Sequence, residues 1–287
     1  MSLLSPQLLA FIKVAKNKTV HGAAAEMFLT QTAVTQRIRI LEGSLKTTLF
    51  IRTRKGMILT QEGESLLRYC QAAIELEGEA LASIQESGKE SEIEITISSP
   101  TSIMRSRVIP NCLPIIKKFP NLLINFNAND DENLHLDLRS GNSDFSIIQK
   151  EQLSQEMKFK ELAPEQYVLV CGSSWKNRKL SEIIKNERII DFNSPDQITI
   201  NYLKKYRLYN NAKSNRYFAN RTDNLALLVS EGVGYTTLPK EFAMRYIKKN
   251  QLMVLNDNNI YNISPVLAWF DRPVPPAYFS EIINLIN

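Results

Sequence analysis

Side chains that can hydrogen-bond to nucleic-acid bases are concentrated in one short stretch of the sequence. Residues 31–41 show helical periodicity, with an apolar side made by Ala33, Val34, Ile38 and Leu41. The other side and the start of this predicted helix carry hydroxyl, amide and guanidinium groups, on Gln31, Thr32, Thr35, Gln36, Arg37 and Arg39. Such groups read base edges in the major groove of duplex DNA. Each of them alone is better explained as an exposed surface residue, so the prediction depends on their combination.

Three further basic residues, Arg52, Arg54 and Lys55, follow this helix. They lie in two short extended pieces joined around Lys55-Gly56, a pattern typical of a β-hairpin. A hairpin at this place would lay the three side chains on phosphates or in the minor groove. We therefore expect a wing beside the helix.

Two shorter helices are expected to hold the base-reading helix in place. Ser5-Pro6 is a favourable helix start. Apolar residues then recur at helical spacing at Leu8, Phe11, Ile12 and Ala15. An Ala-rich helix follows over residues 22–28, and Thr30 or Thr32 can cap the next one after a polar break. Two short helices joined by a tight turn predict a helix-turn-helix, whose second helix enters the major groove.

Charge is distributed unevenly along the 287 residues. Residues 1–60 hold nine Lys or Arg and two Asp or Glu, a net charge of +7, whereas residues 61–90 hold two and seven, a net charge of −5. The rest of the chain has a net charge of +3. A basic head followed by an acidic segment predicts a polyanion as the partner of the head alone.

Composition excludes several other classes of protein. No apolar run approaches the roughly 20 residues that span a bilayer, and the N-terminus lacks the pattern of a secretory signal. Cys70, Cys112 and Cys171 are far apart and odd in number, which favours reduced thiols over disulfides or a metal cluster. Two histidines are too few for a histidine-rich metal site. We expect a cytoplasmic protein with no membrane partner and no metal.

Three motifs follow one another over residues 24–63. They are Ala24-Ala25-Glu26-x-Phe28-x-Thr30-Gln31-x-Ala33-Val34-Thr35-x-x-Ile38-x-x-Leu41-Glu42, Leu49-Phe50-x-Arg52-Thr53 and Leu59-Thr60-x-x-Gly63. Together they resemble the LysR-type transcriptional regulators. The resemblance implies an α/β protein with a winged helix-turn-helix over residues 1–60, a long linker helix for dimerisation over 61–88, and a two-lobed α/β effector domain like type 2 periplasmic binding proteins. It also implies DNA-contact positions at Gln31, Thr32, Thr35, Gln36 and Arg37 in the recognition helix, and at Arg52 and Arg54 in the wing.

The sequence departs from the family pattern at four positions. Thr32 stands where proline or serine is common, His21 where an aromatic residue is frequent, and Gln36 where arginine is frequent. The base preference of relatives therefore does not carry over. Lys46 stands where a glycine usually ends the recognition helix, and a non-glycine residue adopts the left-handed conformation of that position at a cost.

Residues 60–88 predict one long helix that begins at Thr60. Its apolar stripe consists of Leu67, Cys70, Ile74, Leu81 and Ile84, with Leu66, Ala73 and Ala80 alongside and Glu77 as the one interruption. A helix of this length is a rod of about 42 Å, too long for a small head to cover. We expect an interface between two such helices, and the alternative is packing against the chain's own C-terminal domain. A dimer would place two recognition helices on half-sites about one turn of DNA apart.

After a polar linker over 87–91, strand and helix patterns alternate to the end of the chain. Strands are expected at 93–97, 122–126, 144–148, 167–171, 188–192, 216–218, 234–238 and 264–272, and helices at 103–118, 196–206, 222–231 and 277–286. The alternation predicts an α/β domain, and the long gap between the first two strands favours a parallel pairing. The resemblance implies one lobe from residues 92–163 and 264–287 and a second lobe from 164–263.

No catalytic motif accompanies these elements, because the sequence has neither a G-x-S-x-G elbow nor a phosphate-binding loop. We therefore expect no enzyme, no catalytic residue and no cofactor. A ligand-binding domain fits better, since loops at strand ends and helix starts collect ligands in α/β sheets. The candidate effector-binding residues are Ser99, Thr101, Ser102, Asp130, Phe192, Asp196, Thr222 and Asp223. For each of the hydroxyls, ordinary helix capping is nearly as good an explanation.

A weaker resemblance concerns the effector itself. Residues 191–196, the helix after them and residues 267–270 resemble the branch of the family that responds to lysine or arginine. A cationic side chain would need a carboxylate, for which Asp130, Asp144, Asp196 and Asp223 are candidates. Aromatic acids are the competing effectors.

The resulting hypothesis is a ligand-responsive, DNA-binding transcriptional regulator. Its expected partners are double-stranded operator DNA, a small-molecule effector and a second or further copies of the chain in a homodimer or homotetramer, with RNA polymerase as a further candidate. The alternatives are an amino-acid-binding module without DNA function, which the basic head argues against, and an α/β enzyme with an accessory N-terminal domain, which the missing catalytic motifs argue against.

Overall fold

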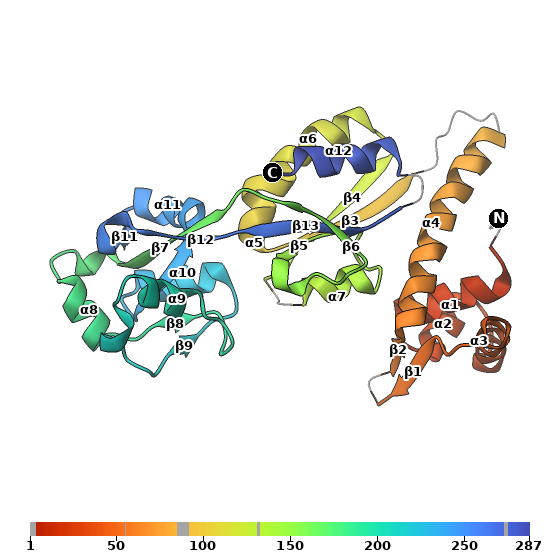
Figure 1. The fold of residues 1–287 in the computed structure, drawn as a ribbon, viewed down its shortest axis with the longest axis horizontal. Helices are drawn as coiled ribbons and strands as arrows, with labels where there is room; N and C mark the ends of the chain where they lie inside the picture. Colours follow the sequence, from red (N-terminus) through yellow and green to blue (C-terminus); the bar gives the residue numbers. More distant parts are fainter. Residues whose placement is uncertain (1–3, 55, 85–91, 131–132, 273–274) are drawn as a thin grey trace.

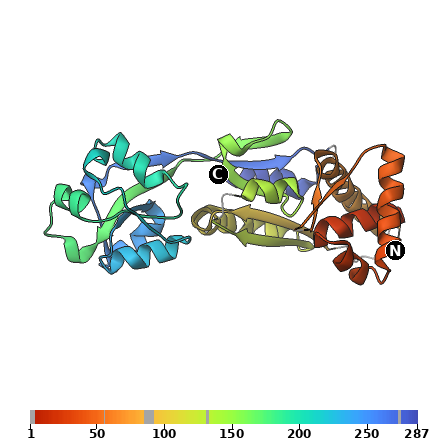
Figure 2. The same ribbon diagram turned by 90° about the horizontal axis from the view of Figure 1, so that it is seen from below.

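The computed structural model describes residues 4–54, 56–84, 92–130, 133–272 and 275–287. The molecule is elongated, with a helical head at one end and two α/β lobes in a row beyond it (Figure 1). Figure 2 shows the same three parts from below, with the long helix between the head and the nearer lobe. None of the described helices is long and apolar enough to cross a membrane.

The head consists of three helices and a β-hairpin. They are α1 (Pro6–Asn17), α2 (Val20–Glu26), α3 (Gln31–Leu45), β1 (Phe50–Thr53) and β2 (Gly56–Leu59). Each helix begins at a hydroxyl cap, because the side chains of Ser5, Thr19 and Thr30 accept hydrogen bonds from the first turns of α1, α2 and α3. Thr30 is thus the cap of the third helix, not Thr32. The predicted helix-turn-helix and hairpin wing are confirmed.

The apolar sides of these helices meet in one core. Val34, Ile38 and Leu41 of α3 are buried there. Phe11 of α1 and Phe50 of β1 lie in the same cluster, with ring centroids 5.2 Å apart. The buried side of α3 leaves its polar side directed away from the core.

The long helix α4 (Gln61–Ile84) starts where Thr60 Oγ1 accepts a hydrogen bond from the amide of Gly63. Its first turns belong to the head, since Leu67 and Cys70 are buried in the head core. Ile74, Leu76 and Tyr69 are exposed. The side chains of Ala80, Leu81 and Ile84, which complete the predicted stripe, and the linker at 87–91 lie outside the described residues.

Polar side chains also join α4 to the nearer lobe. Arg68 pairs with Glu156 at 2.6 Å, and its guanidinium lies 4.2 Å from the ring centroid of Phe270. Arg139 pairs with Glu64 at 3.0 Å. This side of the helix therefore packs on the chain's own C-terminal domain, while the apolar residues further along it remain open.

Lobe I is a five-stranded sheet in the order β4-β3-β5-β13-β6. Its strands are β3 (Ile93–Ser99), β4 (Leu122–Ala128), β5 (Phe145–Gln149), β6 (Met157–Glu161) and β13 (Pro265–Phe270). The pairing of β3 with β4 is parallel, as predicted, whereas β13 runs antiparallel between β5 and β6. Helices α6 (Ile109–Lys118) and α12 (Ala277–Leu285) lie on one face and α7 (Leu134–Arg139) on the other (Figure 1).

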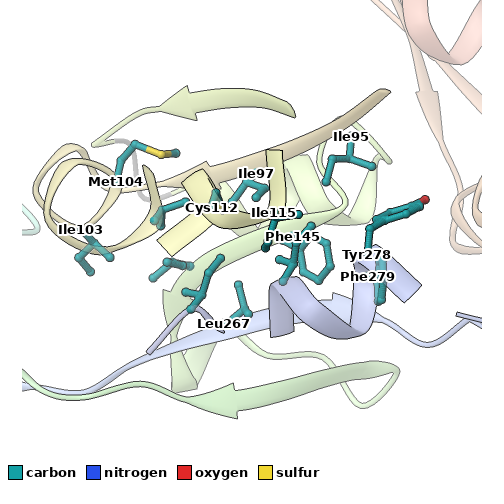
Figure 3. Packing of buried hydrophobic residues seen from close by; sticks show 14 of the residues in the cluster. Ile95, Ile97, Ile103, Met104, Cys112, Ile115, Phe145, Leu267, Tyr278 and Phe279 are labelled. Atoms are coloured by element: carbon teal, nitrogen blue, oxygen red, sulfur yellow. The ribbon is translucent and has the colours of Figure 1, made fainter. Parts of the chain in front are cut away.

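The core of lobe I lies between the sheet and its two covering helices. Phe145 of β5 and Phe279 of α12 have ring centroids 4.3 Å apart, and both side chains are buried (Figure 3). The predicted helix over 103–118 is not continuous. It consists of α5 (Thr101–Ile103), a π-helical turn (Met104–Val108) and α6.

Lobe II is built around the central strand β7 (Glu165–Gly172), to which β10 (Tyr235–Pro239), β11 (Leu252–Val254) and β12 (Ile260–Ile263) pair antiparallel. A small parallel pair, β8 (Ile190–Asp191) and β9 (Tyr217–Phe218), lies beside it. The helices are α8 (Leu180–Asn186), α9 (Ile198–Lys205), α10 (Thr222–Ser230) and α11 (Lys240–Lys248). Alternate residues of β7 enter two cores on its opposite faces. The chain crosses between the lobes twice, between β6 and β7 and between β12 and β13.

Candidate nucleic-acid interface and ligand cleft

The polar side of α3 is open to solvent. Gln31, Thr32, Gln36 and Arg39 are exposed, and Thr35 and Arg37 are partly exposed. Because the opposite side is buried in the head core, the helix can present these groups without rearrangement. The arrangement suits a helix that enters the major groove.

One contact fixes a member of this polar side. Gln31 Nε2 and His21 Nδ1 lie 3.1 Å apart, which joins the start of α3 to the start of α2. Thr35 Oγ1 in turn donates to the carbonyl oxygen of Gln31 at 2.8 Å. The sequence identified His21 only as a departure from the family pattern, and its place beside Gln31 could not be inferred from the spacing.

The wing presents Arg52 and Arg54 to solvent, and Lys55 lies outside the described residues. The hairpin is anchored to the end of α1, where the amide of Met57 donates to the carbonyl oxygen of Lys18 at 2.7 Å. Gly56 has a φ of +120°, and a Cβ there would lie 2.4 Å from that same oxygen. Only glycine permits this approach.

Four arginines of the head are placed to meet an anion. Within the described part of the chain, Arg37, Arg39, Arg52 and Arg54 have no ion-pair partner. Unpaired guanidinium groups on a helix and its neighbouring wing are suited to phosphate contacts.

A cavity of about 740 Å³ opens between the two lobes. This volume lies within the usual range for small-molecule sites. Five of the predicted effector-binding residues line it, namely Ser102, Asp130, Phe192, Asp196 and Thr222. They come from both lobes, so only the tertiary structure brings them together.

The other three predicted residues do not line the cleft. Ser99 is buried and donates to the carbonyl oxygen of Pro100. Thr101 contributes its amide to Asp130. Asp223 is exposed and pairs with Arg221 at 3.1 Å. The further candidate Asp144 lies away from the cleft, where it pairs with Arg272 at 2.7 Å.

Backbone amides hold the two aspartates of the cleft, Asp130 and Asp196. Asp130 Oδ1 accepts from the amide of Thr101 at 2.7 Å. The oxygens of Asp196 accept from the amides of Ile198 at 2.8 Å and Phe192 at 3.2 Å. Because a carboxylate has about four acceptor positions, each can still bind a donor from a ligand.

Tyr167 lines the cleft beside acidic groups. Its hydroxyl donates to Glu165 Oε2 at 2.9 Å. Burial raises the pKa of Tyr167 well above its usual value, and the negative charges of Glu165, Asp196 and Asp130 raise it further. Lys150 also lines the cavity, but it pairs with Glu161 at 2.7 Å. The site therefore favours a cationic ligand over an anionic one.

An arginine that the sequence did not single out shapes the cleft wall. Arg216 pairs with the buried Asp191 at 2.7 Å and donates to the carbonyl oxygens of Ser194 and Asp196. It thereby holds the loop that carries Phe192 and Asp196 into the cavity.

The described residues show neither a metal-binding group nor a reactive cysteine. No three His, Cys, Asp or Glu among them are placed to hold a metal ion. Burial raises the pKa of Cys70 and Cys112 to about 11 and that of Cys171 to about 12. All three are therefore thiols at neutral pH, and a thiol is a poor nucleophile.

A winged helix-turn-helix joined through a long helix to a two-lobed domain with a ligand cleft defines a ligand-responsive DNA-binding regulator. Comparison with known proteins agrees with this class. Residues 6–64 match the family described as "Bacterial regulatory helix-turn-helix protein, lysR family", and residues 88–277 match the "LysR substrate binding domain". The chain belongs to the LysR family of transcriptional regulators.

Several relatives are similar over part or all of the chain. The regulator BsdA of Bacillus subtilis is 24% identical over 97% of this chain and 98% of its own length. CzcR of the same organism is 31% identical over 42% of this chain and 41% of its own length.

Solved structures show the same fold. ArgP from Mycobacterium tuberculosis has a TM-score of 0.78 at 20% identity, covering 99% of this chain and 96% of that one. LysG from Corynebacterium glutamicum, solved with bound effector Arg, has a TM-score of 0.72 at 16% identity, with the same coverage.

Proposed function

We propose that this regulator binds a basic amino acid in the cleft between its lobes and that this binding changes its affinity for operator DNA. The acidic character of the cleft carries the proposal, since Asp130 from one lobe and Asp196 from the other line it and keep free acceptor positions. A guanidinium or ammonium group of the ligand would donate charge-assisted hydrogen bonds to the free acceptor positions of these carboxylates. The bound arginine of LysG supports the same class of ligand.

An aromatic acid is the second candidate effector. Phe192, Tyr167 and Tyr261 line the cavity and offer apolar surface to a ring. The carboxylate of such a ligand would, however, lie among like charges. We therefore favour the basic amino acid.

Titration calorimetry on the full chain tests the choice, with arginine, lysine, benzoate and salicylate as probes. Arginine or lysine should bind, and Asp130→Asn or Asp196→Asn should weaken that binding by about tenfold, because a charge-assisted bond is lost. Asp223→Asn, a carboxylate outside the cavity, is the matched control and should leave it unchanged. Heat from an aromatic acid alone, or from neither class, rejects the basic amino acid as effector.

The same proposal assigns roles to the rest of the chain. The polar side of α3 reads the operator, the wing holds phosphates, and the apolar residues further along α4 join two copies into a dimer or tetramer. The regulator acts by binding alone, with RNA polymerase as its downstream partner and no catalytic step. Ligand binding shifts the equilibrium between two arrangements of the lobes. The size of the shift is set by the difference between the ligand's affinities for the two arrangements. Light scattering of a variant with Ile74→Lys and Leu76→Lys tests the assembly, and an unchanged mass would reject this interface.

A further inference from the structure

A second cavity, of about 380 Å³, lies next to the cleft. Ser102 and Pro239 line both cavities. The walls of the second one come from residues 101–107 at the start of the first helical segment of lobe I, the crossing residues 163–166, residues 239–245 at the start of α11, and Asn287. Both lobes and one of the connections between them therefore contribute to it.

Four cationic side chains converge on this cavity, on Arg105, Arg107, Lys240 and Arg245. Within the described ranges, none of them forms an ion pair. Arg107 donates to the carbonyl oxygens of Ala163 and Pro164, which fixes it against the segment that crosses between the lobes. Arg105, Lys240 and Arg245 are exposed. Like charges gathered in a concave site attract a counter-ion of opposite charge.

The acidic groups at the same cavity do not cancel these cations. Glu241 is exposed, whereas Glu165 is buried and accepts a hydrogen bond from the hydroxyl of Tyr167. Burial raises the pKa of Glu165, so its negative charge is disfavoured. The second cavity therefore has an excess of positive charge, whereas the neighbouring cleft is acidic.

We propose that this cavity is a second ligand site, which takes a small anion bearing two or more carboxylate or phosphate groups. Its volume lies at the lower end of the range for small-molecule sites. The guanidinium groups of Arg105 and Arg245 offer paired donors that match the oxygens of either group. Because its charge is opposite to that of the cleft, the two sites select different ligands. A bound anion would touch both lobes and so depend on their arrangement.

Titration calorimetry on the full chain at constant ionic strength tests the site, with citrate and pyrophosphate as probes. At least one of them should bind, and binding by citrate alone or by pyrophosphate alone identifies the preferred group. Combining Arg105→Ala with Arg245→Ala should weaken binding at least about tenfold, since two charge-assisted contacts are lost. Arg245→Gln alone should weaken anion binding several-fold. This single variant still tests the site if the double variant does not fold.

A charge-matched control localises the effect. Lys248→Ala with Lys249→Ala removes the same charge at the other end of α11, outside the cavity, and should leave anion binding unchanged. The site is rejected if neither probe binds up to about 10 mM, tenfold above a 1 mM dissociation constant. It is also rejected if Arg245→Gln and the double variant bind like the unaltered chain.

Discussion

Asp130 and Thr222 join the two lobes across the ligand cleft. Thr222 Oγ1 at the start of α10 donates to Asp130 Oδ2 at 3.4 Å, while Asp130 Oδ1 accepts from the amide of Thr101 at 2.7 Å. One carboxylate thus caps the first helical segment of lobe I and touches the opposite lobe. A ligand cation that binds Asp130 must share it with, or take it from, Thr222.

The stabilities of two variants should distinguish the two contacts of Asp130. Asp130→Ala removes both and is expected to cost about 1–2 kcal/mol, since it removes a helix cap and a hydrogen bond. Thr222→Val removes only the longer bond and should cost about 0.5 kcal/mol or less. Calorimetric melting measures the difference, with Asp223→Ala as the control. Equal effects of the two variants would contradict the capping role.

Sequence preference should reside in Gln31. Gln31→Ala is expected to change the ranking of operator variants, with a loss of about 1–3 kcal/mol at the preferred base. His21→Ala should give a smaller change in the same direction, because His21 only positions the Gln31 amide. Fluorescence anisotropy with a panel of duplexes measures the ranking. An unchanged ranking for Gln31→Ala would show that another part of α3 reads the bases.

The wing should contribute affinity for DNA without contributing sequence preference. Arg52 is exposed and has no ion-pair partner among the described residues, so it can contact a phosphate. Arg52→Ala should weaken all duplexes alike and reduce the slope of log affinity against log salt by about 0.9. Titrations at several salt concentrations give this slope. A loss confined to one duplex would assign Arg52 to base reading instead.

Much of the head could be predicted from the sequence because its signals are local. Apolar spacing, hydroxyl caps and the Lys55-Gly56 turn all act within a few residues. The short strands β6, β11 and β12 were missed, since Lys158 and Lys160 of β6, for example, break an apolar pattern, and a strand at the edge of a sheet needs little apolar surface.

The cleft was predictable only in part. Polar residues at strand ends and helix starts indicated where ligands gather, but not which side chains face inward. Asp130 and Thr222 are 92 residues apart in the chain and meet through the packing of the two lobes. Ser99 and Asp223 satisfy the same sequence pattern, yet Ser99 is buried and Asp223 is exposed. Burial depends on tertiary packing, which local spacing does not encode.

Lys46 offers a direct way to stabilise the head. It ends α3 with φ 53° and ψ 37°, the left-handed conformation that the sequence predicted to be costly for a non-glycine residue. Lys46→Gly should stabilise the head by about 0.4–1 kcal/mol, and Lys46→Ala should not. Thermal melting of the three proteins tests this. No gain for glycine would mean that other contacts of Lys46 offset the strain.

Glu165 should make stability fall as the pH rises. Burial raises its pKa above the usual 4.5, against the opposing effects of Ser102, Tyr167 and Arg107. The folded protein thus keeps this proton to a higher pH than the unfolded chain does. The stabilisation is fully present below the unfolded pKa and is lost as the pH rises through the folded pKa. Asp144 and Asp191, whose pKa values burial also raises, add to the same trend.

Glu165→Gln removes one of these titrations without removing the side chain's bulk. The melting temperature of the variant should fall less steeply than that of the unaltered chain between about pH 5 and pH 8, and at the upper end the variant should be at least as stable. Glu241→Gln, an exposed neighbour, should leave the slope unchanged. If Glu165→Gln and the unaltered chain gave parallel curves, Glu165 would have the same pKa in the folded and unfolded states, and its buried carboxyl would be charged as readily as one in water.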